Sequence, residues 1–257
     1  MNEKKSPKIA LITGGSRGLG KDMALKIAQR GNNIIITYNS KKAEAEDVIR
    51  QLKELGVEAE ALQLNTGNIS GLNAFAVTLS EMLGKTFNAE RIDYLVNNAG
   101  TSLDATALAD VTEQQLDNLL SVNFKGVFFL TQRLLPLLND GGGIVNISSG
   151  LARFTVPGSG AYASLKSAIE TLTRYQAKEF GSRGIRCNFV APGAVATDFS
   201  GGHLRDNPQV QEFVKSVTAL QRIATPDDIG GVVAFLCSDD AKWVTAQRIE
   251  ASGGMFL

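Results

Sequence analysis

Short apolar runs alternate with longer helix-like stretches along the whole chain. The apolar runs never occur as pairs joined by a two-residue turn. We predict strands over residues 8–13, 33–38, 57–64, 92–97, 143–148, 185–191 and 245–251. We predict helices over residues 19–30, 41–55, 71–83, 112–138, 162–180 and 226–237.

This alternation indicates parallel strands with helices packed on both faces of one sheet. The strands lack a clean period-two alternation, which is typical of a sheet buried on both sides. The sequence therefore predicts an α/β fold around a doubly wound parallel sheet of seven strands. Nothing resembling a linker divides the chain, so we expect a single domain over residues 1–257.

The longest stretch without a strand, residues 192–226, follows the sixth predicted strand. Connections of this length inside a compact domain are usually functional. We therefore expect a substrate lid at about residues 194–225. The alternative is a helical excursion that only packs against the domain, and the two readings are compatible.

Composition and charge narrow the class of partner. Hydrophobic residues make up 44% of the chain, and 26 basic residues balance 26 acidic ones, so no basic surface suggests nucleic acid. No apolar run approaches the roughly 18 residues of a membrane span, and the N-terminal MNEKKSPK lacks the apolar core of a secretory signal. We expect a small-molecule substrate.

The cysteines and the histidine point to a cytoplasmic protein without a metal site. Cys187 and Cys237 stand alone, so we expect small core residues in a reducing cytosol. His203 is the single histidine, which argues against a histidine-based metal site and against a Ser-His-Asp triad.

The first predicted strand runs into a glycine-rich loop, TGGSRGLG at residues 13–20, which opens a helix. Glycines let the backbone turn tightly and approach a pyrophosphate, whose charge is met by the amides at the helix start. In this position the pattern predicts a dinucleotide site. A glycine-rich turn without a ligand is the alternative.

The end of the second strand predicts which dinucleotide binds. A site that prefers NAD usually offers an acid there, but residues 37–40 are Thr, Tyr, Asn and Ser. Arg17 supplies a cation close to where the 2′-phosphate of NADP would lie, with hydrogen bonds from Asn39 or Ser40. We predict NADP(H) as the preferred cofactor over NAD(H). The alternative is that Arg17 is only a solvated loop cation.

Tyr162 and Lys166 lie four residues apart in a predicted helix, so they share one face. A neighbouring ammonium stabilises a phenolate and so lowers the pKa of the phenol. Ser149, at the end of the preceding strand, could then hold the reacting oxygen. An isolated pair of this spacing is usually a chance feature of an amphipathic helix, but here other motifs accompany it.

Two further features involve asparagine. The NNAG turn at residues 97–100 closes the fourth strand with small residues, which suits a backbone that passes close to a cofactor, although a simple strand-end turn is the alternative. Asn123 falls inside a long predicted helix, where asparagine is a poor helix former. We therefore expect a local backbone role for Asn123.

Taken together, these motifs resemble the short-chain dehydrogenase/reductase family, in its group with a TGxxxGxG cofactor loop. The family's elements occur in its order over essentially the whole chain: TGGSRGLG, NNAG, Asn123, Ser149, YASLK at residues 162–166, and PG at residues 192–193. The resemblance implies a Rossmann-like domain with strand order 3-2-1-4-5-6-7. It also implies hydride transfer between NAD(P) and a carbonyl or secondary alcohol, and a homotetramer or dimer, of which we expect the homotetramer.

The resemblance also implies a role for each catalytic residue. Tyr162 would be the general acid in reduction and the base in oxidation, while Ser149 would hydrogen-bond the substrate oxygen. Lys166 would lower the pKa of Tyr162 and hold the nicotinamide ribose. Asn123 would seat a water that links Lys166 to solvent.

The cofactor contacts come from the glycine loop, from the ends of the second to fourth strands and from the start of the lid. At the adenine, many family members have Asp-Val where this chain has Asn65 and Thr66, which puts the strength of that contact in doubt. The full set is Gly14, Ser16, Arg17, Gly18, Leu19, Gly20, Asn39, Ser40, Asn65, Thr66, Asn98, Ala99, Gly100, Tyr162, Lys166, Pro192, Gly193, Val195 and Thr197.

The main hypothesis is thus an NADP(H)-dependent carbonyl reductase, and two alternatives remain. A 3-oxoacyl-carrier-protein reductase would favour a basic patch for the acidic carrier, for which Lys125, Arg133 and Arg153 are candidates. A non-catalytic dinucleotide sensor typically loses the tyrosine or the lysine, and this chain retains both. A partly apolar substrate pocket is expected from Leu103, Phe154, Val156, Phe199, His203 and Leu204.

Overall fold

The computed structural model describes residues 7–257, so residues 1–6 of the polar N-terminal stretch lie outside it. Within that range seven parallel strands form one sheet in the order β3-β2-β1-β4-β5-β6-β7, which confirms the expected order. The strands are β1 Ile9–Ile12, β2 Asn33–Tyr38, β3 Ala59–Gln63, β4 Ile92–Asn97, β5 Leu138–Ile147, β6 Arg186–Pro192 and β7 Arg248–Ala251.

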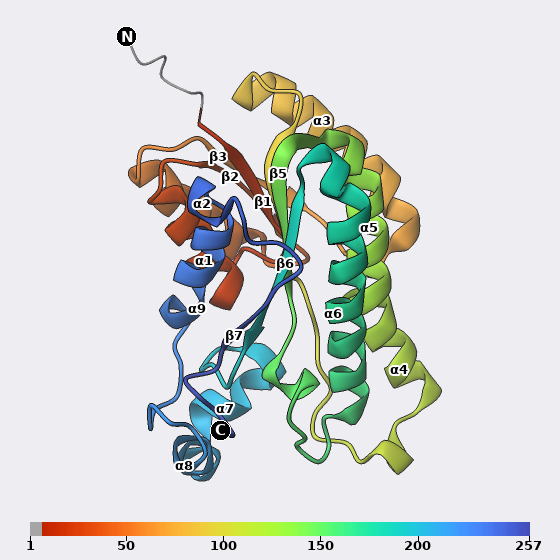
Figure 1. The fold of residues 1–257 in the computed structure, drawn as a ribbon, viewed down its shortest axis with the longest axis vertical. Helices are drawn as coiled ribbons and strands as arrows, with labels where there is room; N and C mark the ends of the chain where they lie inside the picture. Colours follow the sequence, from red (N-terminus) through yellow and green to blue (C-terminus); the bar gives the residue numbers. More distant parts are fainter. Residues whose placement is uncertain (1–6) are drawn as a thin grey trace.

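Helices cover both faces of the sheet (Figure 1). One face carries α1 (Gly18–Ala28), α2 (Lys42–Glu54) and α9 (Asp227–Leu236). The other carries α3 (Leu72–Phe87), α5 (Val127–Leu134) and α6 (Gly160–Phe180), with α4 (Glu113–Leu120) leading into α5. Two short helices, α7 (His203–Asp206) and α8 (Pro208–Ser216), lie at one end of the sheet.

The core consists of two apolar clusters, one on each face of the sheet. In β2, Ile34 and Ile36 belong to the cluster under α1, whereas Ile35 belongs to the cluster under α3. Because successive side chains of a strand point to opposite faces, an apolar run fills both clusters. Burying each of these side chains stabilises the fold by about 1.5–3 kcal/mol.

The prediction of one continuous helix over residues 112–138 is wrong. It is divided into α4, a π-helical turn over Ser121–Gly126, α5 and a 3₁₀ turn over Leu135–Leu137. The strand β5 then begins at Leu138, five residues before the predicted start. Gly142 permits this extension, because a Cβ there would lie 2.4 Å from the carbonyl oxygen of Asp93.

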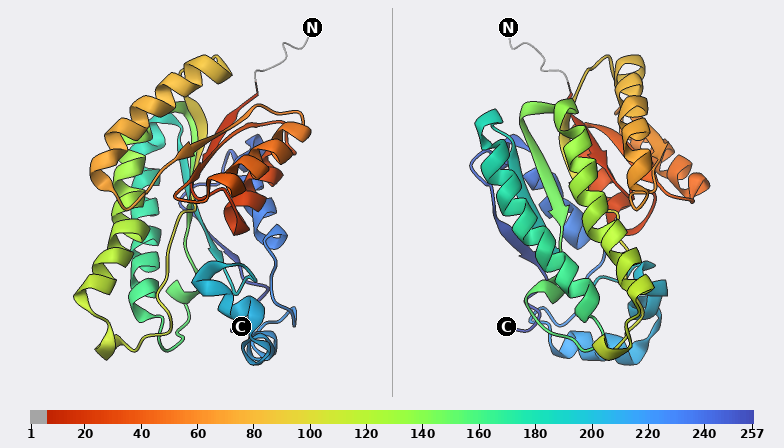
Figure 2. Two further views of the ribbon diagram at one scale, coloured as in Figure 1. Left: turned by 180° about the vertical axis from the view of Figure 1, so that it is seen from behind. Right: turned by 90° about the vertical axis from the view of Figure 1, so that its right-hand side faces the viewer.

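The parallel strands bring the turns that follow β1, β4, β5 and β6 to the same end of the sheet, the lower end in Figure 1. There α7 and α8 lie beside the C-terminal end of the chain in all three views (Figures 1 and 2). The contact is direct, since the Leu220 amide after α8 donates to the carbonyl oxygen of Gly253 at 3.1 Å. The sequence motifs that follow these strands therefore lie together at one edge of the sheet.

Cys187 and Cys237 are buried and unpaired, which confirms their place in the core. Burial raises the pKa of both thiols to about 12, so neither forms a reactive thiolate near neutral pH. Over residues 7–257 no helix is long and apolar enough to cross a bilayer. The same range holds no group of three or more potential metal-ligating side chains.

Candidate functional site

The glycine-rich loop joins β1 to α1 and is held from the end of β4. Gly14 and Gly18 have left-handed backbones, with φ of 65° and 54°, which glycine adopts without strain. A Cβ on Gly20 would lie 2.2 Å from the carbonyl oxygen of Gly14. Asn98 Nδ2 donates to the carbonyl oxygens of Thr13 at 2.8 Å and Gly14 at 3.1 Å. The motif from β4 thus fixes the loop's shape.

A cavity of about 1080 Å³ runs along the carboxyl ends of the strands. One end is formed by the glycine loop and the residues after β2 and β3, and the other by the loops after β4, β5 and β6. All the residues predicted to touch the cofactor line it: Gly14, Ser16, Arg17, Gly18, Leu19, Gly20, Asn39, Ser40, Asn65, Thr66, Asn98, Ala99, Gly100, Tyr162, Lys166, Pro192, Gly193, Val195 and Thr197.

Ser149, Tyr162 and Lys166 meet on the wall of this cavity. Ser149 follows β5, while Tyr162 and Lys166 lie one turn apart near the start of α6. The Tyr162 hydroxyl is hydrogen-bonded to the Ser149 side chain. Lys166 Nζ lies 5.5 Å from the centre of the Tyr162 ring and donates to the carbonyl oxygen of Ile147 at 2.9 Å.

Burial determines the proton affinity of these groups. It raises the pKa of Tyr162, and the hydrogen bond from Ser149 opposes that rise without cancelling it. The lowering of the Tyr162 pKa by Lys166 stays a prediction, since burial is the larger influence on this phenol. Burial also lowers the pKa of Lys166 to about 8, because leaving water disfavours the ammonium. At neutral pH Tyr162 carries its proton.

Asn123, the fourth predicted catalytic residue, is fully buried and does not line the cavity. Its Oδ1 accepts from the Thr101 amide at 3.2 Å, and its Nδ2 donates to the carbonyl oxygens of Thr101 at 2.9 Å and Leu119 at 3.1 Å. The surrounding Ser121–Gly126 is the π-helical turn. Asn123 thus holds the backbone after the NNAG turn, and its role in seating a water stays a prediction.

The end of the cavity near β2 has the charge expected of an NADP site. No carboxylate follows β2 within the lining, and Asp198 is the one acidic residue among the described residues that line the cavity. Arg17 Nη1 lies 3.6 Å from Asp198 Oδ2. The Arg17 guanidinium therefore already faces one anionic partner, which belongs to the segment after β6.

That segment contacts both ends of the cavity. Asp198 faces Arg17, while the ring of Phe199 lies 6.0 Å from the ring of Tyr162. Val195 forms a parallel bridge with Ala224, which ties the start of the segment to its end. The segment both forms helices, α7 and α8, and lines the cavity, as the two compatible readings of the sequence allow.

The predicted pocket walls are confirmed for five residues and wrong for one. Leu103, Val156, Phe199, His203 and Leu204 line the cavity. Phe154 instead packs against Phe256, with ring centres 5.0 Å apart. Sequence reasoning missed Val111, Leu151, Val210 and Val214. The i,i+4 spacing of the last two was the available signal, since it marks one face of a helix.

A family profile described as "Enoyl-(Acyl carrier protein) reductase" matches residues 14–256. The chain is similar to a 3-oxoacyl-[acyl-carrier-protein] reductase, FabG, of Staphylococcus aureus, with 36% identity over 98% of this chain and 100% of that protein. These matches extend over the whole cavity.

Two solved structures are also similar to this chain over nearly its whole length. The promiscuous reductase LugOII, described as catalysing keto-reduction at C1 during lugdunomycin biosynthesis, has a TM-score of 0.92 and 36% identity, covering 99% of this chain and 100% of its own. The angucycline C-6 ketoreductase LanV with bound NADP has a TM-score of 0.91 and 35% identity, covering 97% and 95%.

Proposed function

Since this chain belongs to the short-chain dehydrogenase/reductase family, it is an oxidoreductase, and we propose that it reduces a carbonyl to an alcohol with NADPH. The observation that carries this proposal is the placing of Tyr162, hydrogen-bonded to Ser149 and close to Lys166, on the cavity that continues to the glycine loop. A phenol that keeps its proton at neutral pH suits a general acid, and so favours the reducing direction.

The residues of the cavity fit NADPH, which would supply the hydride. The glycine loop lines the cavity at the start of α1, and a pyrophosphate would bind there because backbone amides and the helix dipole favour anions. Arg17, Asn39 and Ser40 would hold the 2′-phosphate, with no acid after β2 to repel it. The similarity to LanV, whose structure holds bound NADP, supports the same choice.

The chain's own groups would then act on the carbonyl. Ser149 would donate a hydrogen bond to the carbonyl oxygen, and Tyr162 would give it a proton as negative charge develops there. Lys166 would hold the nicotinamide ribose and stabilise the phenolate that remains. Asn123 would act through the backbone of Thr101, to which its side chain is hydrogen-bonded.

For the substrate we propose a neutral, largely apolar ketone. The walls at the Tyr162 end include the apolar side chains of Leu103, Val156 and Phe199, and the lysines and arginine of the lining are confined to Lys166 and to the end that holds Arg17 and Lys41. The similarity to LugOII, a keto-reducing enzyme, and to the ketoreductase LanV supports a ketone as the substrate. The segment over residues 194–225 would serve as the lid, within a single domain of residues 1–257.

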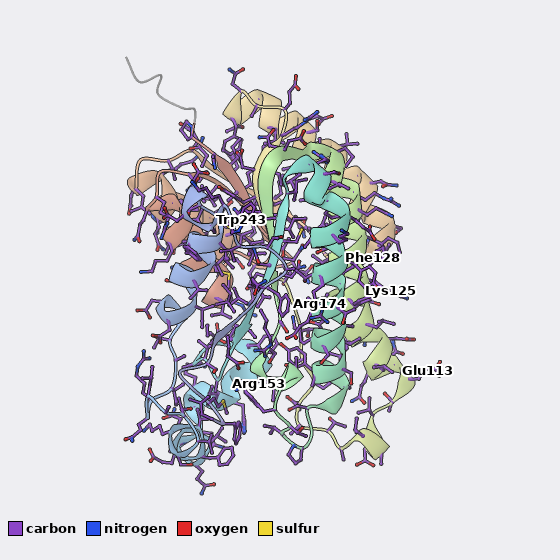
Figure 3. All side chains as sticks on the ribbon, viewed as in Figure 1. Glu113, Lys125, Phe128, Arg153, Arg174 and Trp243 are labelled. Carbon is purple, nitrogen blue, oxygen red and sulfur yellow. The ribbon has the colours of Figure 1, made fainter. Side chains whose placement is uncertain are left out.

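A 3-oxoacyl-carrier-protein reductase is the second candidate, favoured by the named function of the Staphylococcus relative. Its expected basic patch finds little support. Arg153 is paired with Glu250 at 3.3 Å, and the labelled Arg153 and Lys125 lie well apart in Figure 3.

We also propose that the protein is a cytoplasmic homotetramer.

Two measurements test the proposed function. Steady-state oxidation of NADPH with a panel of neutral ketones should show turnover, and Tyr162→Phe should reduce kcat by at least the roughly 10²-fold that general acid catalysis contributes. NADPH binding should survive the substitution. Near-full activity of Tyr162→Phe would overturn the mechanism. Turnover confined to acyl-carrier thioesters would overturn the proposed substrate class.

A second variant tests cofactor choice. Arg17→Ala should weaken NADPH by about ten- to a hundredfold, the range for charge-assisted hydrogen bonds to phosphate, and leave NADH nearly unchanged. The measurement is the Kd of each reduced cofactor by fluorescence. Equal losses with both cofactors would show that Arg17 is only a solvated loop cation.

A further inference from the structure

Four charged side chains form a connected network beside Ser149, outside the cavity lining. Arg248 and Glu250 lie two residues apart on the edge strand β7, so they share one face of the sheet. Glu170 lies on α6, which packs on that face, and Arg153 follows the turn after Ser149. The proposed mechanism uses none of these four residues.

Arg248 is the centre of this network. Its Nε donates to Glu170 Oε1 at 3.1 Å, and its Nη1 donates to Glu250 Oε2. Arg153 Nε lies 3.3 Å from the same Glu250 oxygen. The Glu170 and Arg248 side chains are only 13% and 21% exposed, so their pairing is screened less than that of a surface ion pair.

The network holds the turn that presents Ser149. Arg248 Nη2 donates to the carbonyl oxygen of Ser149 at 3.4 Å. The buried Ser148 hydroxyl donates to Glu170 Oε1 at 2.7 Å and lies 3.3 Å from the carbonyl oxygen of Lys166. Arg248 and Glu170, neither of which lines the cavity, thus hold two consecutive serines that do line it.

We propose that Arg248 is a positioning residue for Ser149 and that it acts jointly with Glu170. This inference rests on the role of Ser149 in the proposed function. The Ser149 hydroxyl must reach both Tyr162 and the substrate oxygen, and a displacement of about 1 Å in such a group can cost on the order of 10²-fold in rate. Arg248 fixes the backbone from which that hydroxyl projects.

Glu170 couples the two serines to Arg248. Arg248 faces it from β7, with Glu250 and Arg153 beyond, and Lys166 lies one turn earlier on α6 with its Nζ bonded to Ile147. Without Arg248 the Glu170 carboxylate loses the cation that holds it toward β7. It is then free to turn away from the Ser148 hydroxyl, which it accepts at 2.7 Å.

The test uses Arg248→Met, Arg248→Lys and the double variant Arg248→Met with Glu170→Gln. Arg174→Met is the matched control, because Arg174 is exposed on α6 and donates only to the neighbouring Thr171 among the described residues (Figure 3). We expect Arg248→Met to lower kcat for ketone reduction about tenfold, with the Kd of NADPH within about twofold. Arg248→Lys should recover part of the loss.

Rescue by the conservative variant distinguishes positioning from a general structural role. Arg248→Lys keeps a cation that can donate to Glu170, so it should recover part of kcat. The double variant should lose about as much as Arg248→Met alone, because both residues act through one network. A kcat of Arg248→Met equal to that of Arg174→Met would overturn the proposal, and so would a loss that Arg248→Lys does not relieve.

A second readout needs no turnover. In protein labelled with ¹³C at the serine β-carbons, the NMR signal of Ser149 should shift in Arg248→Met and stay in place in Arg174→Met, because Arg248 donates to the Ser149 carbonyl oxygen. An unshifted Ser149 signal would overturn this inference. A wild-type protein that reduces no ketone would instead overturn the proposed function, while the NMR comparison still reports on the network.

Discussion

At the scale of single residues, the burial of Lys166 lowers the stability of the folded protein. Its side chain is 4% exposed, and burial lowers its pKa from 10.5 to about 8. Between these values the unfolded chain binds the proton and the folded chain does not, so stability rises with pH. Below pH 8 the folded protein therefore holds a poorly solvated ammonium.

We accordingly expect Lys166→Met to raise the free energy of unfolding at pH 7 by on the order of 2 kcal/mol, although it removes the bond to Ile147. The gain should shrink between pH 8 and 10.5 and nearly vanish above. Urea denaturation at a series of pH values measures it. Lys178→Met, which changes an exposed lysine on the same helix, should show no such trend, and a pH-independent difference for Lys166→Met would contradict the account.

Ala246 is a second residue whose conformation the sequence does not reveal. Its backbone is left-handed with φ of 58°. A Cβ in this region is strained by about 1 kcal/mol, whereas glycine adopts it freely. No pattern in a single sequence reports a backbone angle, so this strain could not be predicted.

Ala246→Gly should stabilise the protein by about 0.5–1 kcal/mol, or raise Tm by about 2 °C in a chain of this size. The gain is limited because glycine also loses more backbone entropy on folding. Ala107→Gly is the matched control, since Ala107 is exposed and has an ordinary φ of −60°, and it should lower Tm slightly. Calorimetry that gave both variants the same sign would refute the strain argument.

At the scale of elements, regular strands and helices were predictable and their interruptions were not. The apolar run of β2 matches its predicted bounds because both faces of the strand are buried. The π-helical turn Ser121–Gly126 gave only an indirect signal, an asparagine inside a helix. Its cause is tertiary: Asn123 bonds to Thr101, and Gly126 packs so closely that a Cβ would lie 2.7 Å from the carbonyl oxygen of Thr66.

The segment after β6 shows the same limit of local reasoning. Its helices were expected only as an alternative, because their short amphipathic patterns lie among glycines and prolines. What the sequence could not reveal is that Asp198 lies between Arg17 and Arg205. A carboxylate in that position competes with a phosphate for the Arg17 guanidinium.

Asp198→Asn should therefore tighten NADPH by about two- to fivefold, the effect of an exposed ion pair of up to about 1 kcal/mol. NADH, which lacks the 2′-phosphate, should change little, and the difference should fade at high salt. The comparison is the Kd of each cofactor. Asp206→Asn removes the other partner of Arg205 without touching Arg17, and an equal effect of both variants would count against the competition.

At the scale of the whole molecule, the alternation of strands and helices predicted a parallel sheet, whereas the strand order was what the family resemblance implied. Seven strands separated by helices can form few parallel sheets with right-handed crossovers, and the order β3-β2-β1-β4-β5-β6-β7 is one of them. The site followed in turn, since parallel strands place their carboxyl ends at one edge. Phe154 was misplaced because a loop side chain has no periodicity to assign it, and it packs toward the C-terminal Phe256.

The surface of the α4, α5 and α6 layer remains apolar in parts. Leu116, Phe128 and Tyr175 are 44%, 38% and 64% exposed, and Figure 3 shows the labelled Phe128 at the outer side of this layer. The C-terminal tail contributes less than its sequence suggests, because Met255 is buried within the chain and only Phe256 and Leu257 are exposed.

Apolar helices of this kind are expensive to leave in water, so we expect them to pair between subunits of a homotetramer. Phe128→Asp places a charge at the centre of that contact, where burying it unpaired costs several kcal/mol, and should shift the protein to smaller species at micromolar concentration. Val77→Asp is the control, because Val77 is 60% exposed on α3, outside this layer. Light scattering coupled to gel filtration measures the masses. A monomeric wild type would exclude the homotetramer. A tetramer that persists in Phe128→Asp would show that the subunits meet at another surface.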